Sequence, residues 1–346
     1  MQAGLMNRSA PRDDFLPTPD SVNVLESQLS EPPPAVVEMI SRLEGDLVLL
    51  GVGGKMGPSM ARMAQRAVNE AGTKQRVIGV SRFSDPQLRD QLESWGLETV
   101  ACDLLNPQEV NELPLAKNVI YLAGFKFGAS QDPGRLWAMN CLAPSLVSLR
   151  YRDSRLVAFS TGNVYRTVPA DSGGSLEEDA TDPHGEYAMA ALGRERMFQH
   201  FSETLNIPMA LLRLNYAHDL RYGVFVDVAQ ELLAGKPVDI STAYVNIIWL
   251  ADANAMTLRA LEHCQAPLQV INMTGPETLK VRTVAEQLAE MMGVSATFIG
   301  EEAPTALLSN ATRGIQLLGA PEVSAEQVIR WTADWVASGR PLLNKP

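Results

Sequence analysis

The amino-acid sequence predicts an α/β fold of the Rossmann type, a doubly wound parallel sheet with a smaller C-terminal α/β part. Two observations support this prediction. Between about residues 46 and 215, short apolar runs alternate with helical or loop stretches, which is typical of parallel strands buried on both faces. The first run is followed by a glycine-rich turn and then by a helix, the usual start of a β-α-β unit.

This pattern divides the chain of 346 residues into three parts. We expect an N-terminal arm and a short helix in residues 1–45, the Rossmann domain in residues 46–215, and a substrate-binding part in residues 216–346, from which some segments return to the core. The first 33 or so residues are polar and interrupted by prolines, so we expect an arm or a poorly ordered leader there. The stretch AVVEMISRL that follows has apolar residues at helical spacing.

The strands of the Rossmann domain are expected in five apolar runs: DLVLLGVG, RVIGVSR, NVIYLAG, RLVAFSTG and PMALLRLN. After about Asn215 the alternation loosens, and VNIIWL and LQVINMTG are expected as strands inside a smaller, mostly helical part. Two amphipathic helices are expected in that part. One is TVAEQLAEMM, which Gly293 closes, and the other is AEQVIRWTADWV, which Ser324 precedes.

Composition and charge argue against several classes of protein. The chain carries 40 acidic and 29 basic residues, a formal net charge of −11, and no basic block offsets this excess. We therefore expect neither a nucleic-acid partner nor an anionic membrane partner. No apolar run approaches about 18 residues and the N-terminus has no apolar signal core, so we expect a soluble, cytoplasmic protein.

The cysteines and histidines suggest no metal site. Cys102, Cys141 and Cys264 are widely spaced and odd in number, so neither a disulfide framework nor a zinc spacing can be drawn through them. The four histidines form no pair at metal-ligand spacing. We expect buried, reduced thiols and no bound metal.

The glycine-rich turn carries the first functional hypothesis. In LVLLGVGGKMGPSM, Gly51, Gly54 and Gly57 follow a G-x-x-G-x-x-G spacing that also encloses Lys55 and Met56. Such glycines allow a tight turn, close approach of the backbone to a pyrophosphate, and close packing of helix on strand. The alternative is a glycine-rich turn without a ligand, but the strand before it and the helix after it favour dinucleotide binding.

The end of the second strand bears on which dinucleotide binds. An acidic residue there usually holds the adenosine ribose, but this sequence has Ser81 and Arg82. A hydroxyl and a guanidinium suit a 2′-phosphate, so within NAD(P) the sequence favours NADP. The alternative is that Arg82 is a solvated surface arginine.

Taken together, these motifs resemble the extended short-chain dehydrogenase/reductase family, the NAD-dependent epimerase/dehydratase group, from about Asp46 to Trp335. Three further stretches, ACDL, YLAGFKFG and WAMN, are similar to that family's cofactor-binding segments. The resemblance implies that these stretches contribute cofactor-binding residues: Asp103, Leu104, Ala123, Gly124, Lys126 and Asn140.

The resemblance also implies a catalytic pair. AFSTGNVY is similar to the family's Ser-Ser-x-x-Val-Tyr strand, which puts Thr161 at the catalytic Ser/Thr position and Asn163 beside the substrate. The stretch HGEYAMAALGRERMF is similar to the active-site helix, with Tyr187 as the acid/base. An alternative for this tyrosine is an ordinary core role. LLRLNYA loosely matches a later motif and adds Asn215 as a substrate contact.

One expected residue is missing. The family carries a lysine four residues after the tyrosine, and here that position is Ala191. A tyrosine side chain ordinarily has a pKa near 10 and needs a nearby cation to act as a base at neutral pH. Arg194, two helical turns after Tyr187, and Lys126 are candidate replacements, as is the positive charge of an oxidised nicotinamide. The alternative for both side chains is an ordinary surface or packing role.

The substrate is less well defined. The segment GKPVDISTAYVNIIWLAD has Val245 and Asn246 where relatives that handle nucleotide sugars carry Arg-Asp, so a substrate diphosphate lacks its usual cation. Arg221 is a candidate grip for a smaller anion, or else a solvated loop arginine. We expect an NAD(P)-dependent oxidoreductase or epimerase that acts on a small-molecule sugar or sugar derivative by reversible hydride transfer. The alternative is a catalytically degenerate NAD(P)-binding protein with a sensing or scaffolding role. The family also suggests a homodimer.

Overall fold

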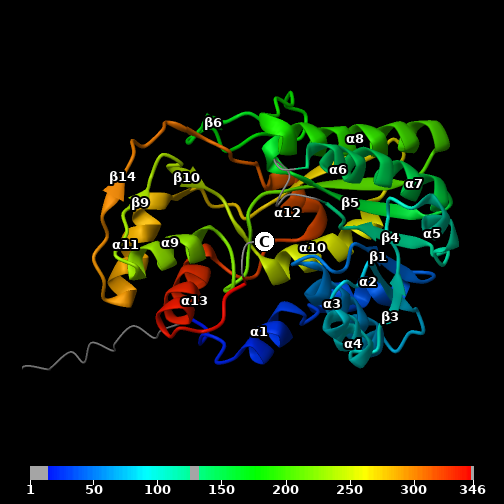
Figure 1. Cartoon of the computed structure of the whole chain (residues 1–346), viewed down its shortest axis with the longest axis horizontal. Helices are drawn as coiled ribbons and strands as arrows, with labels where there is room; N and C mark the ends of the chain where they lie inside the picture. The colour runs from blue at the N-terminus through cyan, green and yellow to red at the C-terminus, as the bar shows by residue number, and fades with distance from the viewer. Residues whose placement is uncertain (1–14, 125–131, 344–346) are drawn as a thin grey trace, which may run out of the picture.

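The computed structural model describes residues 15–124 and 132–343, and its centre is a seven-stranded sheet in which every neighbouring pair is parallel (Figure 1). In spatial order the strands are β12 (Gln269–Met273), β7 (Met209–Leu214), β5 (Arg155–Thr161), β4 (Asn118–Tyr121), β1 (Leu47–Leu50), β2 (Val77–Ser81) and β3 (Glu98–Ala101). The first strand lies between the second and the fourth, as in a doubly wound Rossmann sheet. The predicted fold class is confirmed.

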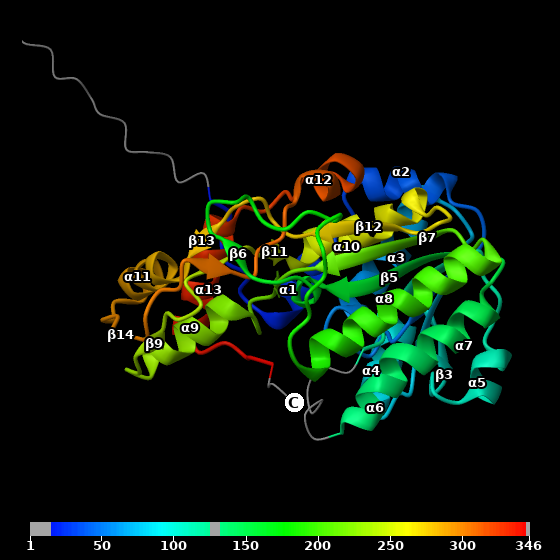
Figure 2. The same ribbon diagram turned by 90° about the horizontal axis from the view of Figure 1, so that it is seen from above.

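The sheet is covered by helices on both faces (Figure 2). Alternate residues of β1 show why the strand sequences are continuously apolar. Leu47 and Leu49 join the core on one face, while Val48 and Leu50 join the core on the other, and all four are at most 1% exposed. A polar residue at any of these positions would therefore be buried.

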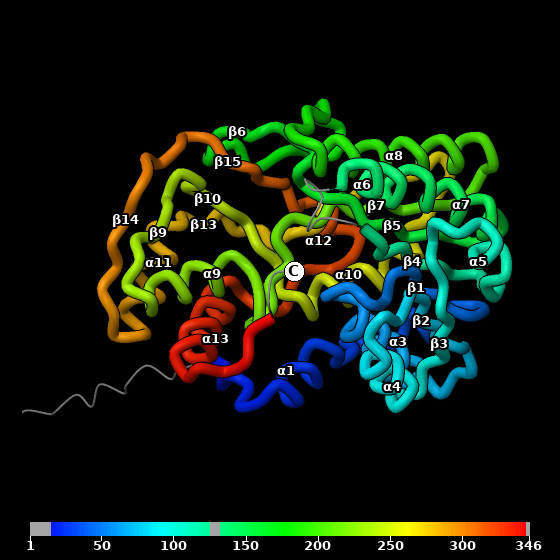
Figure 3. The backbone as a smooth tube through the Cα atoms, in the orientation of Figure 1, coloured from blue at the N-terminus to red at the C-terminus, as the bar shows by residue number. Residues whose placement is uncertain are grey.

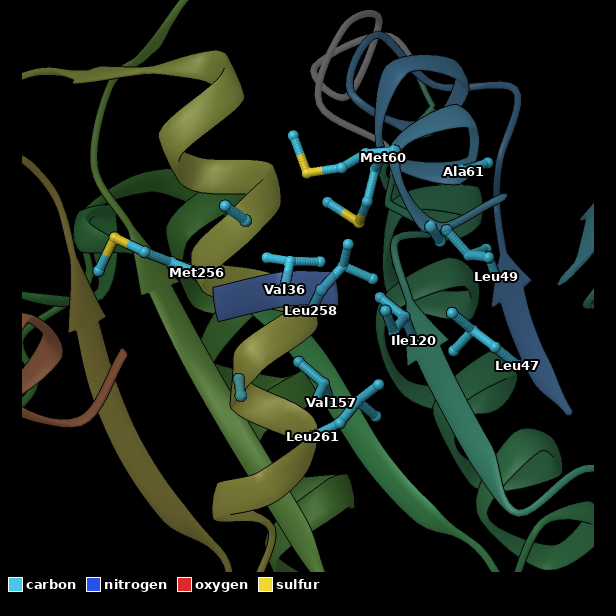
Figure 4. Close-up of a cluster of buried hydrophobic side chains, with 14 of the residues drawn as sticks. Val36, Leu47, Leu49, Met60, Ala61, Ile120, Val157, Met256, Leu258 and Leu261 are labelled. Atoms are coloured by element: carbon cyan, nitrogen blue, oxygen red, sulfur yellow. The ribbon is translucent and has the colours of Figure 1, made fainter. Parts of the chain in front are cut away.

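One face is packed against α2 (Pro34–Arg42), α3 (Gly57–Ala71) and α10 (Leu250–Arg259). In Figure 4, Val36 from α2, Met60 from α3 and Leu258 from α10 point toward the strand residues Ile120 and Val157. The helix α2 covers the predicted stretch AVVEMISRL except for its final leucine, so that prediction is confirmed. Further elements on or beside this face are α4 (Pro86–Ser94), η3 (Ala260–His263) and α12 (Thr312–Leu318).

The other face is packed against the long helix α8 (Gly185–Leu205) and its neighbours. Phe198 of α8 and Tyr121 of β4 are both fully buried and meet edge to face, with ring centroids 5.2 Å apart. The neighbouring elements are α5 (Pro107–Glu112), α6 (Pro133–Trp137), the π-helical turn η1 (Ala138–Leu142) and α7 (Ala143–Arg150).

A smaller part with its own apolar core lies beside the sheet. Its helices are α9 (Val224–Leu233), α11 (Val281–Met292) and α13 (Ala325–Ala337). Its short strand pairs are β8 (Ala217–His218) with β11 (Ile248–Trp249), β9 (Val238–Asp239) with β14 (Phe298–Ile299), and β10 (Tyr244–Val245) with β13 (Leu279–Lys280). Ser324 caps α13 and Gly293, with a φ of 68°, closes α11, so both predicted helices are confirmed.

Two strand predictions for this part need correction. The stretch VNIIWL is not one strand but contributes to two short ones, β10 and β11. The stretch LQVINMTG forms β12 at the edge of the large sheet, so it is one of the segments that return to the core. Figure 3 shows the chain from β14 to β15 (Thr305–Ala306) crossing back toward the sheet, where β15 pairs with β6 (Val168–Pro169).

The alternative of a poorly ordered leader is wrong for residues 15–33, because they include a packed helix; residues 1–14 lie outside the described part. Ser21 caps the helix α1 (Val22–Leu29), whose Leu25 and Leu29 are fully buried. We call residues 15–33 the N-terminal strap because they contact both parts of the molecule. On the sheet side, Arg66 donates a hydrogen bond to the carbonyl oxygen of Ser27, and Asn254 donates one to the carbonyl oxygen of Leu29. On the side of the small part, Gln327 and Trp331 of α13 form hydrogen bonds with the backbone of Leu16.

Candidate active site

A cavity of about 440 Å³ lies at the carboxyl ends of the strands, where ligands bind in doubly wound sheets. It opens beside the glycine turn that follows β1. Several predicted cofactor residues line it: Gly51, Gly54, Ser81, Arg82, Asp103, Leu104, Ala123 and Gly124. These residues come from the ends of four different strands, so the sheet brings together positions that are far apart in the sequence.

Each glycine of the turn has a distinct reason to lack a side chain. Gly51 has a φ of 89°, and a Cβ there would lie 2.7 Å from the backbone nitrogen of Ala123. A Cβ at Gly57 would lie 2.1 Å from the carbonyl oxygen of Val52, so this glycine allows the helix to pack on the turn. At Gly54 the nearest protein atom would be 3.6 Å away, which leaves this backbone accessible to a ligand. The turn therefore fits the predicted division of roles.

The helix α3 begins directly after this turn. No side chain caps its N-terminus, where Met56 is the first flanking residue. Met56 packs against the apolar cores and Lys55 lies over the ring of Tyr222, 4.6 Å from its centroid, so neither side chain lines the cavity. The backbone amides at the start of α3, rather than these side chains, are suited to meet an anion.

The end of β2 presents a hydroxyl and a cation to the cavity. The Ser81 Oγ lies close to Gly53 of the glycine turn: a Cβ added to Gly53 would be 2.6 Å from this oxygen. Arg82 is exposed on the cavity wall. The nearest downstream carboxylate in the chain, Asp85, accepts the backbone N–H of Gln87 as the cap of α4.

The end of β3 is held in place by local hydrogen bonds. Asp103 accepts the backbone N–H of Leu105 at 3.0 Å, and its own N–H donates to Glu109 at 2.7 Å. Leu104 is 6% exposed and packs in the core beneath. These contacts fix the floor of the cavity.

Sequence reasoning missed several lining residues, namely Gly53, Val80, Ser84, Cys102, Leu122, Arg135 and Met139. Burial raises the pKa of the Cys102 thiol to about 11, so it remains a neutral wall residue rather than a nucleophile. Arg135 and Met139 follow the loop after β4. No local motif marks Arg135, and within the stretch WAMN the resemblance implies only Asn140, not Met139, as a cofactor-binding residue. The predicted Asn140, in the π-helical turn, does not line the cavity, and its amide donates instead to Leu136 O of the preceding helix α6. Lys126 lies outside the described residues.

Thr161 is the last residue of β5. Its Oγ1 accepts the backbone N–H of Asn163 at 3.2 Å, which starts the short helix η2 (Gly162–Val164). Because the oxygen acts as the acceptor in that bond, the hydroxyl hydrogen can be directed to another acceptor. Thr161 and Asn163 are half-buried at the carboxyl edge of the sheet.

Tyr187 lies in the first turn of α8 and packs against Leu136 and Ala190. Ala191, four residues after Tyr187, is fully buried against Val164 and Tyr165. The helix turn that begins with the tyrosine therefore lies beside the segment that follows Thr161. The methyl group of Ala191 carries no charge, and its fully buried surroundings leave no space for a longer side chain.

A buried ionic network lies directly behind this segment. The Arg213 guanidinium binds Glu195 through two hydrogen bonds, of 3.0 and 2.8 Å, and Ser160 Oγ donates to the same carboxylate at 2.5 Å. Arg213 also donates to the hydroxyl of Tyr165, which in turn donates to Asn272. Burial raises the pKa of Tyr165 to about 12, so this tyrosine stays neutral. The network fixes α8 to the ends of β5, β7 and β12.

Asn215 belongs to a second polar cluster next to Gly162. Its amide donates to Asn246 Oδ1 at 2.6 Å, and Asn246 donates to Ser309 O at 2.7 Å. Asn215 Oδ1 would lie 3.0 Å from a Cβ at Gly162. The amide of Asn215 is therefore used within the chain, and its role as a substrate contact stays a prediction.

Arg221 lies in a different environment from the one expected of an anion grip. Its guanidinium donates to Asp219 and to Glu26 of the N-terminal strap, and the residue is 8% exposed. Two carboxylates already neutralise it, so we do not assign it to the binding of a substrate anion.

Among residues 15–124 and 132–343, no group of histidine, cysteine, aspartate or glutamate side chains is arranged to hold a metal ion. None of the helices in these two ranges has the length and apolar character needed to cross a membrane.

Comparisons with known proteins extend these observations. The model of the NAD dependent epimerase/dehydratase family matches residues 47–272. No curated protein matches the sequence significantly. Among solved structures, UDP-glucuronic acid 4-epimerase from Bacillus cereus, in complex with UDP-glucuronic acid and NAD, is 18% identical with a TM-score of 0.68, over 85% of this chain and 99% of that one.

Two further structures have the same fold. A dTDP-glucose 4,6-dehydratase from Bacillus anthracis in complex with NAD is 14% identical with a TM-score of 0.69, over 85% of this chain and 96% of that chain. RMD from Pseudomonas aeruginosa, complexed with NADPH, is 20% identical with a TM-score of 0.65, over 85% of this chain and all of that one. At these identities the likeness establishes the fold and leaves the substrate open.

Proposed function

Because the chain belongs to the NAD-dependent epimerase/dehydratase family, we propose that it is an NAD(P)-dependent oxidoreductase or epimerase that acts on a sugar or sugar derivative by reversible hydride transfer. One observation supports this above all. The cavity beside the glycine turn, Thr161 at the end of β5 and the helix turn of Tyr187 all lie at the carboxyl edge of one sheet. A cofactor and two hydroxyl groups can therefore act on one substrate there.

The residues of the cavity fit a nicotinamide dinucleotide. The accessible backbone of Gly54 and the uncapped start of α3 suit the diphosphate. Ser81 and Arg82 suit a 2′-phosphate, so we propose NADP as the preferred form. When bound, the nicotinamide would accept or donate the hydride.

The chain's own residues would handle the proton and the reacting oxygen. In the proposed mechanism the Thr161 hydroxyl donates a hydrogen bond to the substrate oxygen, because its lone pair already accepts from Asn163. Tyr187 then removes the proton from that oxygen during oxidation and returns it during reduction. Asn163 and Asn215 are proposed to contact the rest of the substrate.

We further propose that the substrate lacks a nucleotide diphosphate. Val245 is 1% exposed in the apolar core, and Asn246 is bonded to Asn215 and to the loop at Ser309. These positions therefore hold no cation for a diphosphate. A screen of free sugars, sugar phosphates and UDP-glucose with NADP and NAD tests this proposal, and turnover of UDP-glucose alone would contradict it.

The proposed role of Tyr187 is tested with Tyr187→Phe. We expect turnover to fall by roughly a thousandfold or more while the Kd for the cofactor changes little, because the hydroxyl acts only in the transition state. The measurements are steady-state rates on any substrate from the screen and cofactor titration by fluorescence. Full activity in Tyr187→Phe would show that another group carries the proton.

Ala191 favours a second candidate function, a cofactor-binding protein without turnover. Its buried position leaves the tyrosine without the family's lysine. This candidate predicts tight binding of NAD(P) and no activity with any substrate in the screen. Hydride transfer that depends on Tyr187 would exclude it.

We also propose a homodimer. Exposed apolar side chains gather on the mutually packed elements α6, η1, α7 and α8: Trp137, Leu142, Leu149 and Met189 are 38–53% exposed. Sedimentation velocity measures the mass in solution, and a monomer at micromolar concentration would contradict this proposal.

A further inference from the structure

Arg194 follows Ala191 by one helical turn and lies on the same face of α8. It is not a surface residue, because only 5% of it is exposed. A buried guanidinium is costly unless a negative group or several acceptors face it. Its partners therefore indicate what it does.

Within the described residues, Arg194 makes one hydrogen bond, from Nη1 to the carbonyl oxygen of Ala123 at 3.0 Å. Its Nε is buried with no hydrogen-bond partner, and no carboxylate pairs with it in this part of the chain. Most of its positive charge is therefore not neutralised by the described residues. Glu195, the next residue, is instead bound to Arg213.

The Arg194 guanidinium lies directly behind the wall of the cofactor cavity. Ala123 and Gly124 line the cavity, and a Cβ at Gly124 would lie 3.2 Å from Arg194 Nη1. The backbone of Ala123 also lies close to the glycine turn: a Cβ added to Gly51 would be 2.7 Å from the backbone nitrogen of Ala123. One layer of backbone therefore separates the guanidinium from the turn that is suited to a diphosphate.

We propose that Arg194 is a further cation of the cofactor site, one that favours the dinucleotide diphosphate through the wall formed by Ala123 and Gly124. This inference rests on the proposed function, because it assumes that a dinucleotide occupies the cavity. It gives the active-site helix a positive charge one turn beyond the position where the family carries its lysine. Arg194 acts by charge and by holding the end of β4, so it is a positioning residue.

The test compares ADP, which carries a diphosphate, with adenosine, which does not. Both are titrated as competitors of NADPH fluorescence in the full-length chain. In Arg194→Met we expect the affinity for ADP to fall on the order of tenfold while the affinity for adenosine is unchanged. Arg194→Lys should keep most of the ADP affinity because it keeps the charge. Arg196→Met, an exposed arginine two residues on, is the matched control and should change neither affinity.

An equal loss of affinity for ADP and adenosine in Arg194→Met would overturn the proposal and leave only structural support of β4. An unchanged ADP affinity would overturn it as well. If Arg194→Met does not fold, Arg194→Gln is measured in its place. A wild type that binds neither NADPH nor ADP would instead contradict the proposed function, so the two failures are distinguishable.

Discussion

The cofactor half and the substrate half of the candidate site use their polar groups in opposite ways. Around the glycine turn, Gly54, Ser81 and Arg82 face a cavity of about 440 Å³. Around Thr161, polar side chains are bonded to one another, Glu195 to Arg213 and Asn215 to Asn246. The first region is arranged for a ligand, whereas the second is held together by the chain itself.

This difference indicates which residues determine the affinity for a ligand and which determine the free energy of unfolding. A side chain that faces a cavity contributes little to folding, because water solvates it in the absence of a ligand. A charged side chain that is buried against a partner becomes a large cost when that partner is removed. Substitutions in the cofactor half should therefore alter binding, and substitutions in the substrate half should alter the free energy of unfolding.

The largest effect is expected from Arg213→Met. It leaves the Glu195 carboxylate buried without its two guanidinium hydrogen bonds, and we expect the free energy of unfolding to fall by about 3–5 kcal/mol. Urea unfolding followed by circular dichroism measures this loss. Arg42→Met, which breaks exposed ion pairs on α2, is the control and should change stability little. A comparable loss of stability in both variants would contradict the expectation that the buried ion pair stabilises the fold more than the exposed ones do.

A smaller effect is expected from Ala191→Lys, where the two halves meet. The added side chain enters a fully buried position against Val164 and Tyr165, so we expect a loss of about 1–3 kcal/mol of stability. If Tyr187 carries the proton, the acidic limb of the pH–rate profile for oxidation, where the rate rises as the tyrosine loses its proton, should also move to lower pH by about one unit, because a nearby cation favours a phenolate.

Thr204→Lys adds the same charge at an exposed position of the same helix, away from the apolar side chains of the proposed dimer surface, and is the control for Ala191→Lys. Thermal melting and the pH–rate profile are measured on both variants. A destabilised Ala191→Lys variant with an unmoved profile would count against tyrosine acid–base chemistry at this position.

The smallest effect is expected from Arg82→Ala. We expect no loss of stability, because the side chain is exposed, and a loss on the order of tenfold in the preference for NADPH over NADH, because the 2′-phosphate loses its cation. Lys74→Ala, at the opposite end of β2, should keep the preference. Equal affinities of the wild type for both cofactors, measured by fluorescence titration, would refute the NADP assignment.

Much of the cofactor half could be predicted from the sequence because its signals are local. A buried strand such as Leu47–Leu50 must be apolar on both faces, and glycines at fixed spacing are needed where the backbone turns and touches β4. Family likeness added Thr161 and Tyr187, and the structure places both beside the carboxyl edge of the sheet.

The errors arose where distant contacts decide the outcome. The residues before Pro34 look like a polar arm, yet Leu25 and Leu29 are buried because α10 and the small part cover them. The pairing of Arg221 with Glu26 of the strap, beside its near neighbour Asp219, is likewise a distant contact that the sequence does not show, and the role of Arg221 as an anion grip stays a prediction. The position of β12 in the large sheet depends on its pairing with β7, which no local pattern reveals.

The N-terminal strap has a consequence for motion. Its helix is bonded to Arg66 and Asn254 on the sheet side, while Glu26 binds Arg221 and Leu16 is tied to α13 in the small part. Rotation of the small part away from the sheet would have to break both sets of contacts at once. The strap thus restrains the relative rotation of the sheet and the small part. We therefore expect substrate exchange to depend on the movement of loops rather than on a separation of these two parts.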